Sequence, residues 1–350
     1  MVRGILAYHD AVALLVRAQP QLRWMTGFTG SNGLAILTTD SAHFITDGRY
    51  TGQARSEVKD FELHVPGYDL IGYVATSELL PSNGSVLLMA ESTTLAEMEA
   101  LRSAFPDREW MPQENLLTAT MASKEEHEVE AVRRAQKLTC EVFNAILPSV
   151  RPGVSEREIA AEIVYQHLRR GASAMSFEPI VAAGPNSALP HGRPTDRRLA
   201  VGDVVLLDMG AYVEGYSSDL SRTVVLGAAS DEFRTAYSAV LEAQEAALET
   251  VRAGASGKAV DAVARAVLDR AGYGAYFSHG LGHGVGLDVH EWPRLSYNVD
   301  HVLPENATVT VEPGIYLAER FGIRIEDVVC ARADGCENLT TATKELLVLG

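Results

Sequence analysis

Four carboxylates and one imidazole stand at positions in this chain where a charge would need a partner. They are Asp208, Asp219, His283, Glu312 and Glu326, and each lies in a run of β-forming or glycine-rich residues. Buried anions close to one another repel, and their pKa values rise until some of them bind protons. Divalent cations remove this repulsion, and oxygen ligands with a single histidine suit a pair of hard to borderline metals. The five residues therefore predict a hydrolytic site with two metal ions.

The two aspartates are expected on neighbouring strands. Asp208 ends the apolar run from Val204 to Leu207, and a turn signal at Glu214-Gly215 precedes Asp219. A hairpin would bring the two side chains within about 5 Å of each other. A lone aspartate more often caps a turn, but the pair favours a shared ligand.

His283 lies in a glycine-dense segment from Gly280 to Gly286. Alternate glycines let a backbone approach a bound metal or substrate closely. The spacing does not fit a dinucleotide-binding loop, because Val285 and Leu287 stand where a third glycine would be needed. His290-Glu291 does not complete a zinc-protease motif, since the second histidine is missing. A lone histidine is more often structural. Here three histidines lie within twelve residues, His279, His283 and His290, and this clustering favours a functional site.

The two glutamates are predicted on strand faces that lie opposite apolar residues. The segments Thr308–Glu312 and Gly322–Asp327 both alternate in polarity. Their polar faces carry Glu312 in the first segment, and Arg324 with Glu326 in the second. An ordinary salt bridge would explain a glutamate beside an arginine. Together with two aspartates and a glycine-flanked histidine, the two glutamates favour metal binding instead.

The elements that must position these residues divide the chain into two parts. Residues 1–120 alternate short strands and helices, which predicts a small α/β domain. Residues 121–350 separate helices from a sheet connected mainly by hairpins, which predicts an α+β domain. Strands are expected at Val12–Val16, Leu34–Thr38, Val86–Met89, Val204–Leu207, Val309–Val311 and Ile323–Val329. Helices are expected at Leu95–Phe105, from Ser123 to Pro148, at Ser155–His167 with a capping box, and at Asp231–Val251 and Gly257–Ala271.

Composition excludes several classes of partner. The length of 350 residues favours two domains over one large α/β unit, and the 47% of apolar residues is enough for an ordinary soluble core. A net charge of −16 argues against nucleic acid and anionic membrane surfaces. Three cysteines are too few for a disulfide framework or a cysteine-based zinc site. The first ten residues lack a signal-peptide core and no stretch approaches a membrane span, so a cytoplasmic location is expected.

Four motifs resemble those of the methionine aminopeptidase superfamily, peptidase family M24, whose members share the pita-bread fold and bind two metals. The motifs are Asp208-Met-Gly-Ala with Ser218-Asp219-Leu-Ser-Arg-Thr223, His279-Gly-Leu-Gly-His283 through His290-Glu291, Glu312-Pro-Gly-Ile-Tyr316, and Arg324-Ile-Glu326-Asp327. Gly27-Phe-Thr-Gly-Ser-Asn32 and Thr46-Asp-Gly-Arg-Tyr50 resemble the extra N-terminal domain of the Xaa-Pro branch, the prolidases and aminopeptidases P. The resemblance implies an α+β pita-bread domain preceded by a smaller α/β creatinase-like domain.

The resemblance also implies a role for each residue. The metal ligands would be Asp208, Asp219, His283, Glu312 and Glu326, with Asp219 and Glu326 bridging the two ions. The substrate pocket would be lined by His191, His279 and His290, which handle protons and orientation. Glu312 is the expected proton shuttle, and His279 or His290 would stabilise the tetrahedral intermediate. Arg324, grouped with the substrate-binding residues, is expected to hold a ligating carboxylate in place.

The implied reaction is hydrolysis of the peptide bond before proline in small peptides with proline at the second position. Manganese is the first choice of metal because the ligand set is hard, with cobalt, zinc and iron as alternatives. A dipeptidase is favoured because Arg294 is placed to bind the free carboxylate of a dipeptide; a solvated loop arginine is the other interpretation.

Three other functions are alternatives to the dipeptidase. The first is an aminopeptidase P acting on longer peptides, which would leave the side after proline open. A methionine aminopeptidase and a non-catalytic peptide-binding module are less favoured, because the N-terminal domain and the complete ligand set argue against them. Family analogy implies a homodimer.

Overall fold

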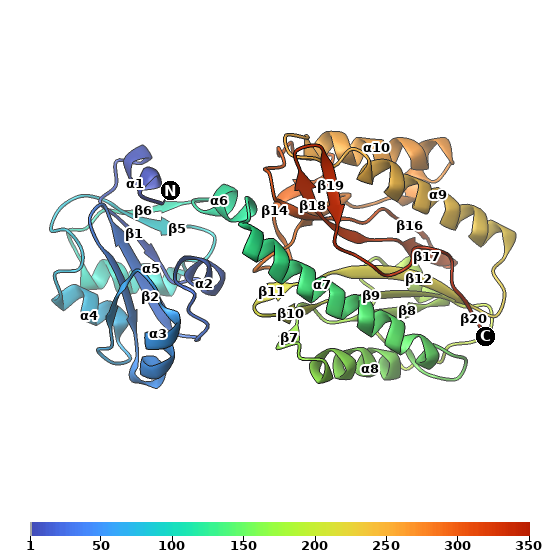
Figure 1. The fold of residues 1–350 in the computed structure, drawn as a ribbon, viewed down its shortest axis with the longest axis horizontal. Coiled ribbons are helices and arrows are strands. Elements are labelled where there is room, and N and C mark those ends of the chain that lie inside the picture. Colours follow the sequence, from blue (N-terminus) through green and yellow to red (C-terminus); the bar gives the residue numbers. More distant parts are fainter. Residues whose placement is uncertain (1) are drawn as a thin grey trace. The chain divides into compact units, whose positions relative to one another are not determined.

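The structure is a computed structural model that describes residues 2–350. Two compact units make up the chain, Met1–Met121 and Ala122–Gly350 (Figure 1). Within the described residues, no helix combines the length and the apolar character needed to cross a membrane.

A six-stranded mixed sheet forms the centre of the first unit, with the strand order β4-β3-β2-β1-β5-β6. Strands β1, β2 and β3 pair antiparallel, whereas β4, β5 and β6 each join by parallel pairing. The strands are β1 Ala13–Val16, β2 Gly33–Thr38, β3 Ala42–Thr46, β4 Glu62–His64, β5 Val86–Met89 and β6 Trp110–Gln113. The helices are α1 Val2–Tyr8, α2 Gln19–Thr26, η1 Gly48–Tyr50, α3 Thr51–Glu57, α4 Leu70–Thr76, α5 Leu95–Ala104 and, across the unit boundary, α6 Thr118–Ala122.

Local sequence explains why these elements form where they do. Every residue of β1 and β5 is buried, as expected for central strands covered on both faces. Helix α5 begins after Thr94, whose hydroxyl accepts from the backbone N–H of Glu97 while the Glu97 carboxylate accepts from the backbone of Thr94. The predicted α/β alternation of this part of the chain is present.

The second unit contains four long helices and fourteen strands among its described residues. The helices are α7 Glu126–Ile146, η2 Leu147–Ser149, α8 Glu156–Arg169, η3 Gly184–Ala188, α9 Asp231–Leu248, α10 Gly257–Arg270 and η4 Gly274–Tyr276. The first strands are β7 Ala174–Met175, β8 Ile180–Ala183, β9 Val204–Met209, β10 Ala211–Val213, β11 Tyr216–Ser217, β12 Leu220–Leu226 and β13 Gly282–Gly284. The remaining strands are β14 Glu291–Leu295, β15 Thr308–Val311, β16 Gly314–Leu317, β17 Phe321–Arg324, β18 Asp327–Arg332, β19 Gly335–Asn338 and β20 Val348–Leu349.

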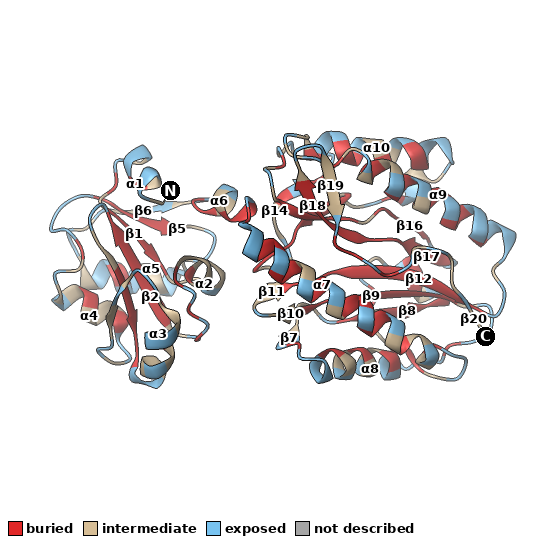
Figure 2. Cartoon of the chain, in the orientation of Figure 1, coloured by how far each residue is buried: buried red, intermediate tan, exposed pale blue. Residues whose placement is uncertain are grey.

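Several small sheets lie between two pairs of helices in this unit. The sheets have the orders β20-β12-β9-β8, β14-β13-β15-β18-β19, β11-β10-β7 and β16-β17. Helices α7 and α8 lie along one side of the strands and α9 and α10 along the other (Figure 1). The strands between them are buried, and the outward faces of the helices are exposed (Figure 2). This is the expected α+β arrangement.

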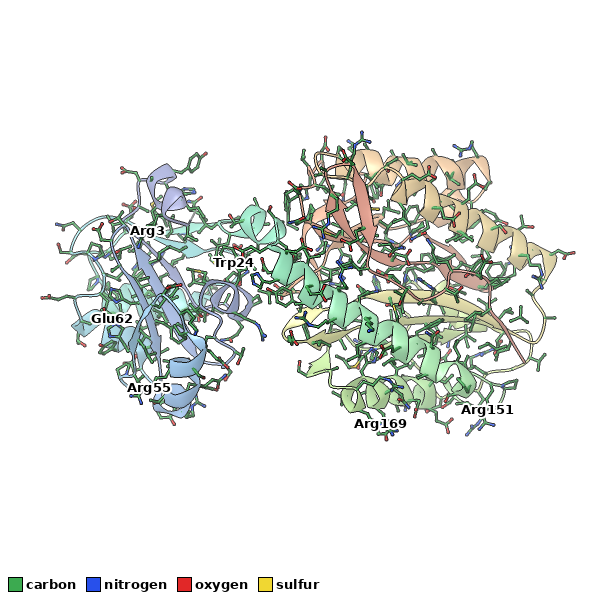
Figure 3. All side chains as sticks on the ribbon, viewed as in Figure 1. Arg3, Trp24, Arg55, Glu62, Arg151 and Arg169 are labelled. Carbon is green, nitrogen blue, oxygen red and sulfur yellow. The ribbon has the colours of Figure 1, made fainter. Side chains whose placement is uncertain are left out.

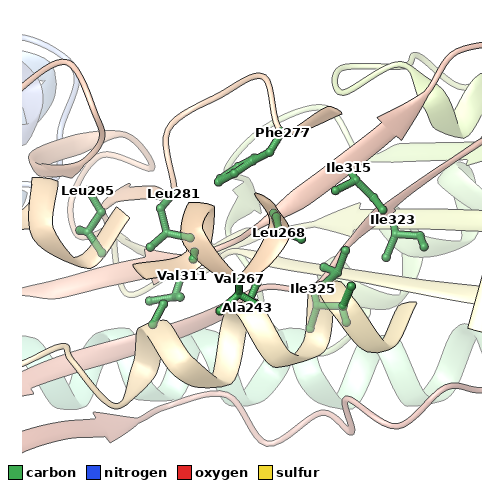
Figure 4. Close-up of a cluster of buried hydrophobic side chains, with 14 of the residues drawn as sticks. Ala243, Val267, Leu268, Phe277, Leu281, Leu295, Val311, Ile315, Ile323 and Ile325 are labelled. Atoms are coloured by element: carbon green, nitrogen blue, oxygen red, sulfur yellow. The ribbon is translucent and has the colours of Figure 1, made fainter. Parts of the chain in front are cut away.

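An apolar core lies where α9 and α10 cover the strands (Figure 4). Val309 and Val311 are fully buried in this core, and so are Ile323 and Ile325. The predicted alternation is therefore confirmed for both glutamate segments, because their apolar residues face the helices and leave the other face to polar groups.

Two boundary predictions are wrong. The strand expected over Ile323–Val329 is broken: β17 ends at Arg324, and β18 begins at Asp327 in a different sheet. The helix expected from Ser123 begins at Glu126, because the capping box is made by Glu125 and Glu128. The other predicted helices and strands differ from the observed ones by a few terminal residues.

Candidate metal centre

Asp208 and Asp219 are brought to the same face of a pair of antiparallel strands. Asp208 of β9 lies opposite Ser221 of β12, and Asp219 comes two residues before Ser221. Residues two apart in an extended chain share a face, so the aspartates are diagonal neighbours. The expected hairpin is thus longer than a single turn, since β10 and β11 form the connection and turn at Glu214-Gly215.

The backbone of Asp219 is held by a side chain from α7. The amide of Gln136 donates from Nε2 to the Asp219 carbonyl at 2.8 Å and accepts at Oε1 from the Asp219 N–H at 3.1 Å. Gln136 is fully buried. A paired amide of this kind fixes the peptide group and thereby the direction of the aspartate side chain.

His283 of β13 has one ring nitrogen committed to the protein and one aimed at the carboxylates. Its Nδ1 lies 3.0 Å from the Gly284 carbonyl, and since a carbonyl only accepts, Nδ1 carries the proton. Its Nε2 lies 3.6 Å from Asp219 Oδ2 and 3.3 Å from Glu312 Oε1. A histidine whose Nδ1 donates to a carbonyl is oriented to ligate a metal through Nε2.

The two glutamates come from different breaks in the sheets. Glu312 directly follows β15, and Thr310 Oγ1 donates to its Oε1 at 3.1 Å. Glu326 stands in the gap between β17 and β18, where its N–H donates to the Ser221 carbonyl at 3.2 Å. Arg222 donates to the Glu326 carbonyl from the other side. Ligand atoms of Glu326, Asp219 and His283 all lie within 4.8 Å of one another.

The glycines around His283 make close contacts within the protein, and two of them, Gly280 and Gly282, also line a cavity at the cluster. A Cβ added at Gly282 would lie 2.0 Å from the Thr310 carbonyl oxygen, and one added at Gly284 would lie 2.5 Å from the Trp292 carbonyl oxygen. Both neighbours are backbone atoms of adjacent strands. The glycines therefore let β13 pass between β14 and β15 and bring His283 to the carboxylates.

Arg324 is buried behind the acidic residues. Its guanidinium donates to Asp208 Oδ2 at 2.6 Å, to Ser221 Oγ at 2.6 Å and to the Tyr316 hydroxyl at 2.8 Å. A further bond reaches the Pro190 carbonyl at 3.0 Å. With its donors directed to protein groups, Arg324 is placed to orient Asp208, and this placement favours the orienting role over direct substrate binding.

The electrostatics of the cluster reflect burial and mutual repulsion. Burial, followed by the charges of neighbouring carboxylates, raises the pKa of Asp219 and of Glu326 well above their ordinary values. Burial also raises the pKa of Asp208, although the Arg324 charge opposes it. Burial acts in the same direction on Glu312, but the hydrogen bond and charge of His283 outweigh it and bring the pKa of Glu312 to about 2. Cations bound at the cluster would relieve this repulsion.

A cavity of about 670 Å³ opens onto this cluster. All eight residues that the sequence assigned as metal ligands or pocket histidines line it, and so do Arg294 and Arg324. The cavity lies entirely within the second unit. Its volume is within the range of sites that bind small molecules.

The three pocket histidines differ in how they are engaged. His279 has both ring nitrogens in hydrogen bonds, Nδ1 to the Gly280 carbonyl at 2.8 Å and Nε2 to the Tyr316 hydroxyl at 2.9 Å. The ring of His290 stacks edge-on against His283, with centroids 4.3 Å apart. His290 is exposed, yet its surroundings, desolvation first and then His283, lower its pKa to about 4. His191 is exposed at the cavity wall.

Arg294 lies directly across the strand pair from His283. The two residues are register partners between β14 and β13. The Arg294 side chain is exposed and lines the cavity, and it makes no hydrogen bond or ion pair with any described residue. A cation with free donors at the wall of a cavity suits a carboxylate ligand.

Three supporting residues were missed by the sequence analysis. Tyr316 links His279 to Arg324 from behind the cavity wall, and burial raises its pKa to about 12. Ser221 and Gln136 hold Arg324 and Asp219, respectively. Tyr316 and Ser221 lie within the quoted motifs, which was the available signal, whereas Gln136 lies far away in a helix with no local signal.

The donor set fits divalent cations. Asp208 Oδ1 is buried and has no hydrogen-bond partner among the described residues. The free lone pair of His283 Nε2 faces two carboxylates, an arrangement that is repulsive unless a cation or a proton lies between them. Both observations favour a bound metal over a set of ordinary salt bridges.

The chain matches a known peptidase family and solved structures over nearly its whole length. Residues 130–333 match metallopeptidase family M24, and residues 1–120 match the creatinase/prolidase N-terminal domain. An uncharacterized peptidase of Bacillus subtilis, YqhT, is 39% identical over 96% of this chain and 95% of its own. The Xaa-Pro dipeptidase structure from Bacillus anthracis has a TM-score of 0.96 and 36% identity, covering 99% of this chain and 98% of that one. The X-Pro aminopeptidase structure from Thermotoga maritima has a TM-score of 0.92 and 38% identity, covering 99% and 100%.

Proposed function

This chain belongs to metallopeptidase family M24, with a creatinase/prolidase N-terminal domain before the catalytic pita-bread domain, and we propose that it is an Xaa-Pro dipeptidase. It would hydrolyse the peptide bond before proline in small peptides and release the N-terminal residue. The observation that carries this proposal is the cavity that joins the buried acidic cluster to the unpaired cation of Arg294. The dipeptidase and aminopeptidase relatives support a substrate with proline at the second position.

The proposed metal ligands are Asp208, Asp219, His283, Glu312 and Glu326, which would hold two divalent ions. When bound, such ions polarise the substrate carbonyl and lower the pKa of water to near neutrality. Manganese is the proposed metal because four carboxylates outnumber one imidazole; cobalt, zinc and iron are the alternatives. Reconstitution of the chelated protein with each metal tests this order.

The residues of the chain would handle charge and protons around the scissile bond. His290 is neutral near pH 7, since its pKa is lowered to about 4. A neutral imidazole has one N–H, which can donate to the oxygen that becomes negative during attack. Glu312, held by Thr310, is the proposed group that takes the nucleophile's proton and returns it to the departing proline nitrogen.

The other two histidines have different proposed tasks. His279 would keep Tyr316 and Arg324 in place, because both of its ring nitrogens are already bonded. His191 stands on an exposed loop at the cavity wall and would close over the substrate. Burial lowers the pKa of His279, so it too remains neutral near pH 7.

Arg294 is the proposed clamp for the free carboxylate of a dipeptide. Its guanidinium faces the same cavity as His283 and is free to make a bidentate pair. A peptide that continues past proline has no carboxylate at this point and would leave Arg294 without its partner. This difference separates a dipeptidase from an aminopeptidase.

The decisive experiment compares the hydrolysis of Ala-Pro with that of Ala-Pro-Ala in the presence of manganese. The proposal expects Ala-Pro to have the higher kcat/KM. A clear preference for Ala-Pro-Ala would assign the chain to the X-Pro aminopeptidases instead. Cleavage of Met-Ala-Ser, which lacks proline, would favour a methionine aminopeptidase, and inactivity on all three peptides would favour a binding module.

We also propose a reducing, cytoplasmic location and a homodimer. Cys140 and Cys330 are buried free thiols and Cys336 is a partly buried one, which suits a reducing compartment. The dimer rests on family analogy. Cell fractionation and sedimentation velocity test these two statements.

A further inference from the structure

A second cluster of side chains of metal-ligating types lies in the first unit, apart from the acidic cluster of the second unit. It consists of His43, Glu62 and His64, and each offers a ligand atom within 4.8 Å of the others. His43 and His64 are nearly covered, with 10% and 13% of their side-chain surfaces exposed, whereas 68% of the Glu62 side chain is exposed. Glu62 is labelled on the first unit in Figure 3. We refer to these three residues as the β3–β4 cluster.

Strand pairing brings the three residues together. Strands β3 and β4 are parallel, with His43 opposite Glu62 and Ile45 opposite His64. Register partners share a face of the sheet, and so do residues two apart along one strand. All three ligand groups therefore project from the face on which Ile45 packs against α4 and α5.

The distances suit a tetrahedral metal ion. His43 Nδ1 lies 3.2 Å from His64 Nε2 and 3.4 Å from Glu62 Oε2, and His64 Nε2 lies 3.8 Å from Glu62 Oε1. Ligands at zinc distances of about 2.0–2.1 Å in tetrahedral geometry are separated by roughly 3.3–3.4 Å. The three groups thus already have nearly the spacing that one ion would impose.

The outer nitrogens of both histidines are oriented as metal ligands require. His43 Nε2 lies 2.9 Å from Ser41 Oγ, and His64 Nδ1 lies 3.2 Å from the Tyr73 hydroxyl. Both hydroxyls can accept, so each outer nitrogen can carry the ring proton. The inner nitrogens, His43 Nδ1 and His64 Nε2, then both direct lone pairs to the same point. Two lone pairs repel each other unless a cation lies between them.

We propose that His43, His64 and Glu62 bind one borderline divalent cation, Zn²⁺ by preference, with solvent as the fourth ligand. Two imidazoles and one carboxylate are a softer set than the acidic cluster of the second unit, and they select zinc over manganese or calcium. The exposed side of the cluster, where Glu62 lies, leaves the fourth position open to water. This site is independent of the proposed peptidase centre.

The site would fasten the edge of the first unit's sheet. Strand β4 has three residues and, among the described residues, pairs only with β3. A metal that joins β3 to both ends of β4, with Tyr73 of α4 behind it, would hold this short edge strand in register. Because the ion binds the folded state, it would raise the unfolding temperature.

The test measures zinc per chain in the full-length protein. Chelated protein is equilibrated with zinc, dialysed and analysed by mass spectrometry for metal content, and its unfolding temperature is recorded with and without zinc. The variants are His64→Ala and Glu62→Gln, and the matched control is His9→Ala, the remaining histidine of this unit. Asp219→Ala reports separately on the second unit.

We expect His64→Ala to bind about one zinc ion fewer per chain than the wild type. Glu62 is exposed, so Glu62→Gln should fold normally. This variant should lower the affinity of the β3–β4 cluster for zinc at least about tenfold. His9→Ala and Asp219→Ala should both keep it. Wild-type zinc content in His64→Ala and Glu62→Gln would overturn the proposal and leave an ordinary pair of hydrogen-bonded histidines. An equal loss in His9→Ala would also overturn it.

Discussion

Arg324 donates to Asp208 Oδ2 at 2.6 Å, while Oδ1 of the same carboxylate is buried and has no hydrogen-bond partner among the described residues. One oxygen is thus fixed by the protein and the other is left for a ligand. A carboxylate oriented in this way needs no rotation before it binds a cation. The relationship gives Arg324 a positioning role that can be measured.

Replacing Arg324 by lysine should lower kcat about 10- to 100-fold and weaken metal binding, although the positive charge is kept. A lysine cannot bond Asp208, Ser221 and Tyr316 at once, so Asp208 loses its fixed direction. Steady-state kinetics and metal titration on the same preparation check this. A lysine variant with wild-type kcat and metal affinity would assign Arg324 to charge balance alone.

Removing a ligand should have a larger effect. In Asp219→Ala and His283→Ala, kcat/KM is expected to fall at least about 100-fold, together with metal content, because each change deletes a proposed ligand. His127→Ala, at an exposed position on α7, is the control. Wild-type turnover in either ligand variant would refute the assigned centre.

The Arg294→Ala variant tests the carboxylate clamp. Loss of a charge-assisted bidentate bond costs about 1.5–3 kcal/mol, so KM for Ala-Pro should rise roughly 10- to 100-fold. KM for Ala-Pro-Ala should change little, because its free carboxylate lies one residue beyond proline and not on the proline that Arg294 would bind. Arg234→Ala, an exposed arginine of α9, serves as the matched control. Equal changes for both peptides would remove the case for a clamp.

Gln136 allows a prediction about stability. Gln136→Leu leaves the buried N–H and carbonyl of Asp219 without their partners, which should cost about 2–4 kcal/mol in the free energy of unfolding. Urea denaturation of the metal-free protein measures this cost. Lys137→Ala, the next residue on the same helix, is exposed and should change stability by less than about 0.5 kcal/mol.

In the metal-free protein, the buried carboxyl groups should lose their contribution to stability as the pH rises above the ordinary carboxyl pKa of about 4, while the histidines whose pKa is lowered to about 4, His167 and His290, act in the opposite direction. The folded-state pKa values of Asp208, Asp219 and Glu326 are raised, so the unfolded chain releases their protons first. The pKa of Glu312 is lowered to about 2, so its contribution to stability has the opposite sign. That contribution is lost only as the pH falls below the ordinary carboxyl pKa.

Melting temperatures in chelator across mildly acidic to neutral pH check this prediction. Added metal should raise the melting temperature more at neutral pH, where the carboxylates would otherwise repel one another. The comparison variant is Asp219→Asn, which lacks one raised carboxyl group but keeps the histidines. Stability in chelator that increases with pH more steeply in the wild type than in this variant would contradict the assigned directions.

The sequence predicted residue types and faces better than it predicted connections. The M24 family and the α+β fold are confirmed, because Asp208, His283 and Glu312 lie in motifs whose residue types are tightly constrained by chemistry. The sequence does not reveal the break between Arg324 and Asp327, because apolar and polar residues keep alternating through it. In the structure the chain leaves the sheet of β16 and β17 at this point and joins the sheet of β15 and β18.

Contacts distant in sequence could not be predicted from local patterns. The Gln136 amide meets Asp219 only when α7 packs on the sheet, and no periodicity encodes that meeting. The β3–β4 cluster is similar: His43 and His64 belong to unremarkable apolar runs, and only the parallel register of their strands brings their nitrogens together.

Strand β14 borders its sheet on one side only, and its register with β13 shifts just after His283. Arg294 pairs with His283, and the next pair along the strands is Gly284 with Glu291. Trp292 and Pro293 therefore have no partner on β13. Inserting or deleting one residue here would turn Arg294 out of the cavity while the five proposed metal ligands kept their places. The proposed carboxylate clamp therefore depends on the register of one edge strand, and the proposed metal centre does not.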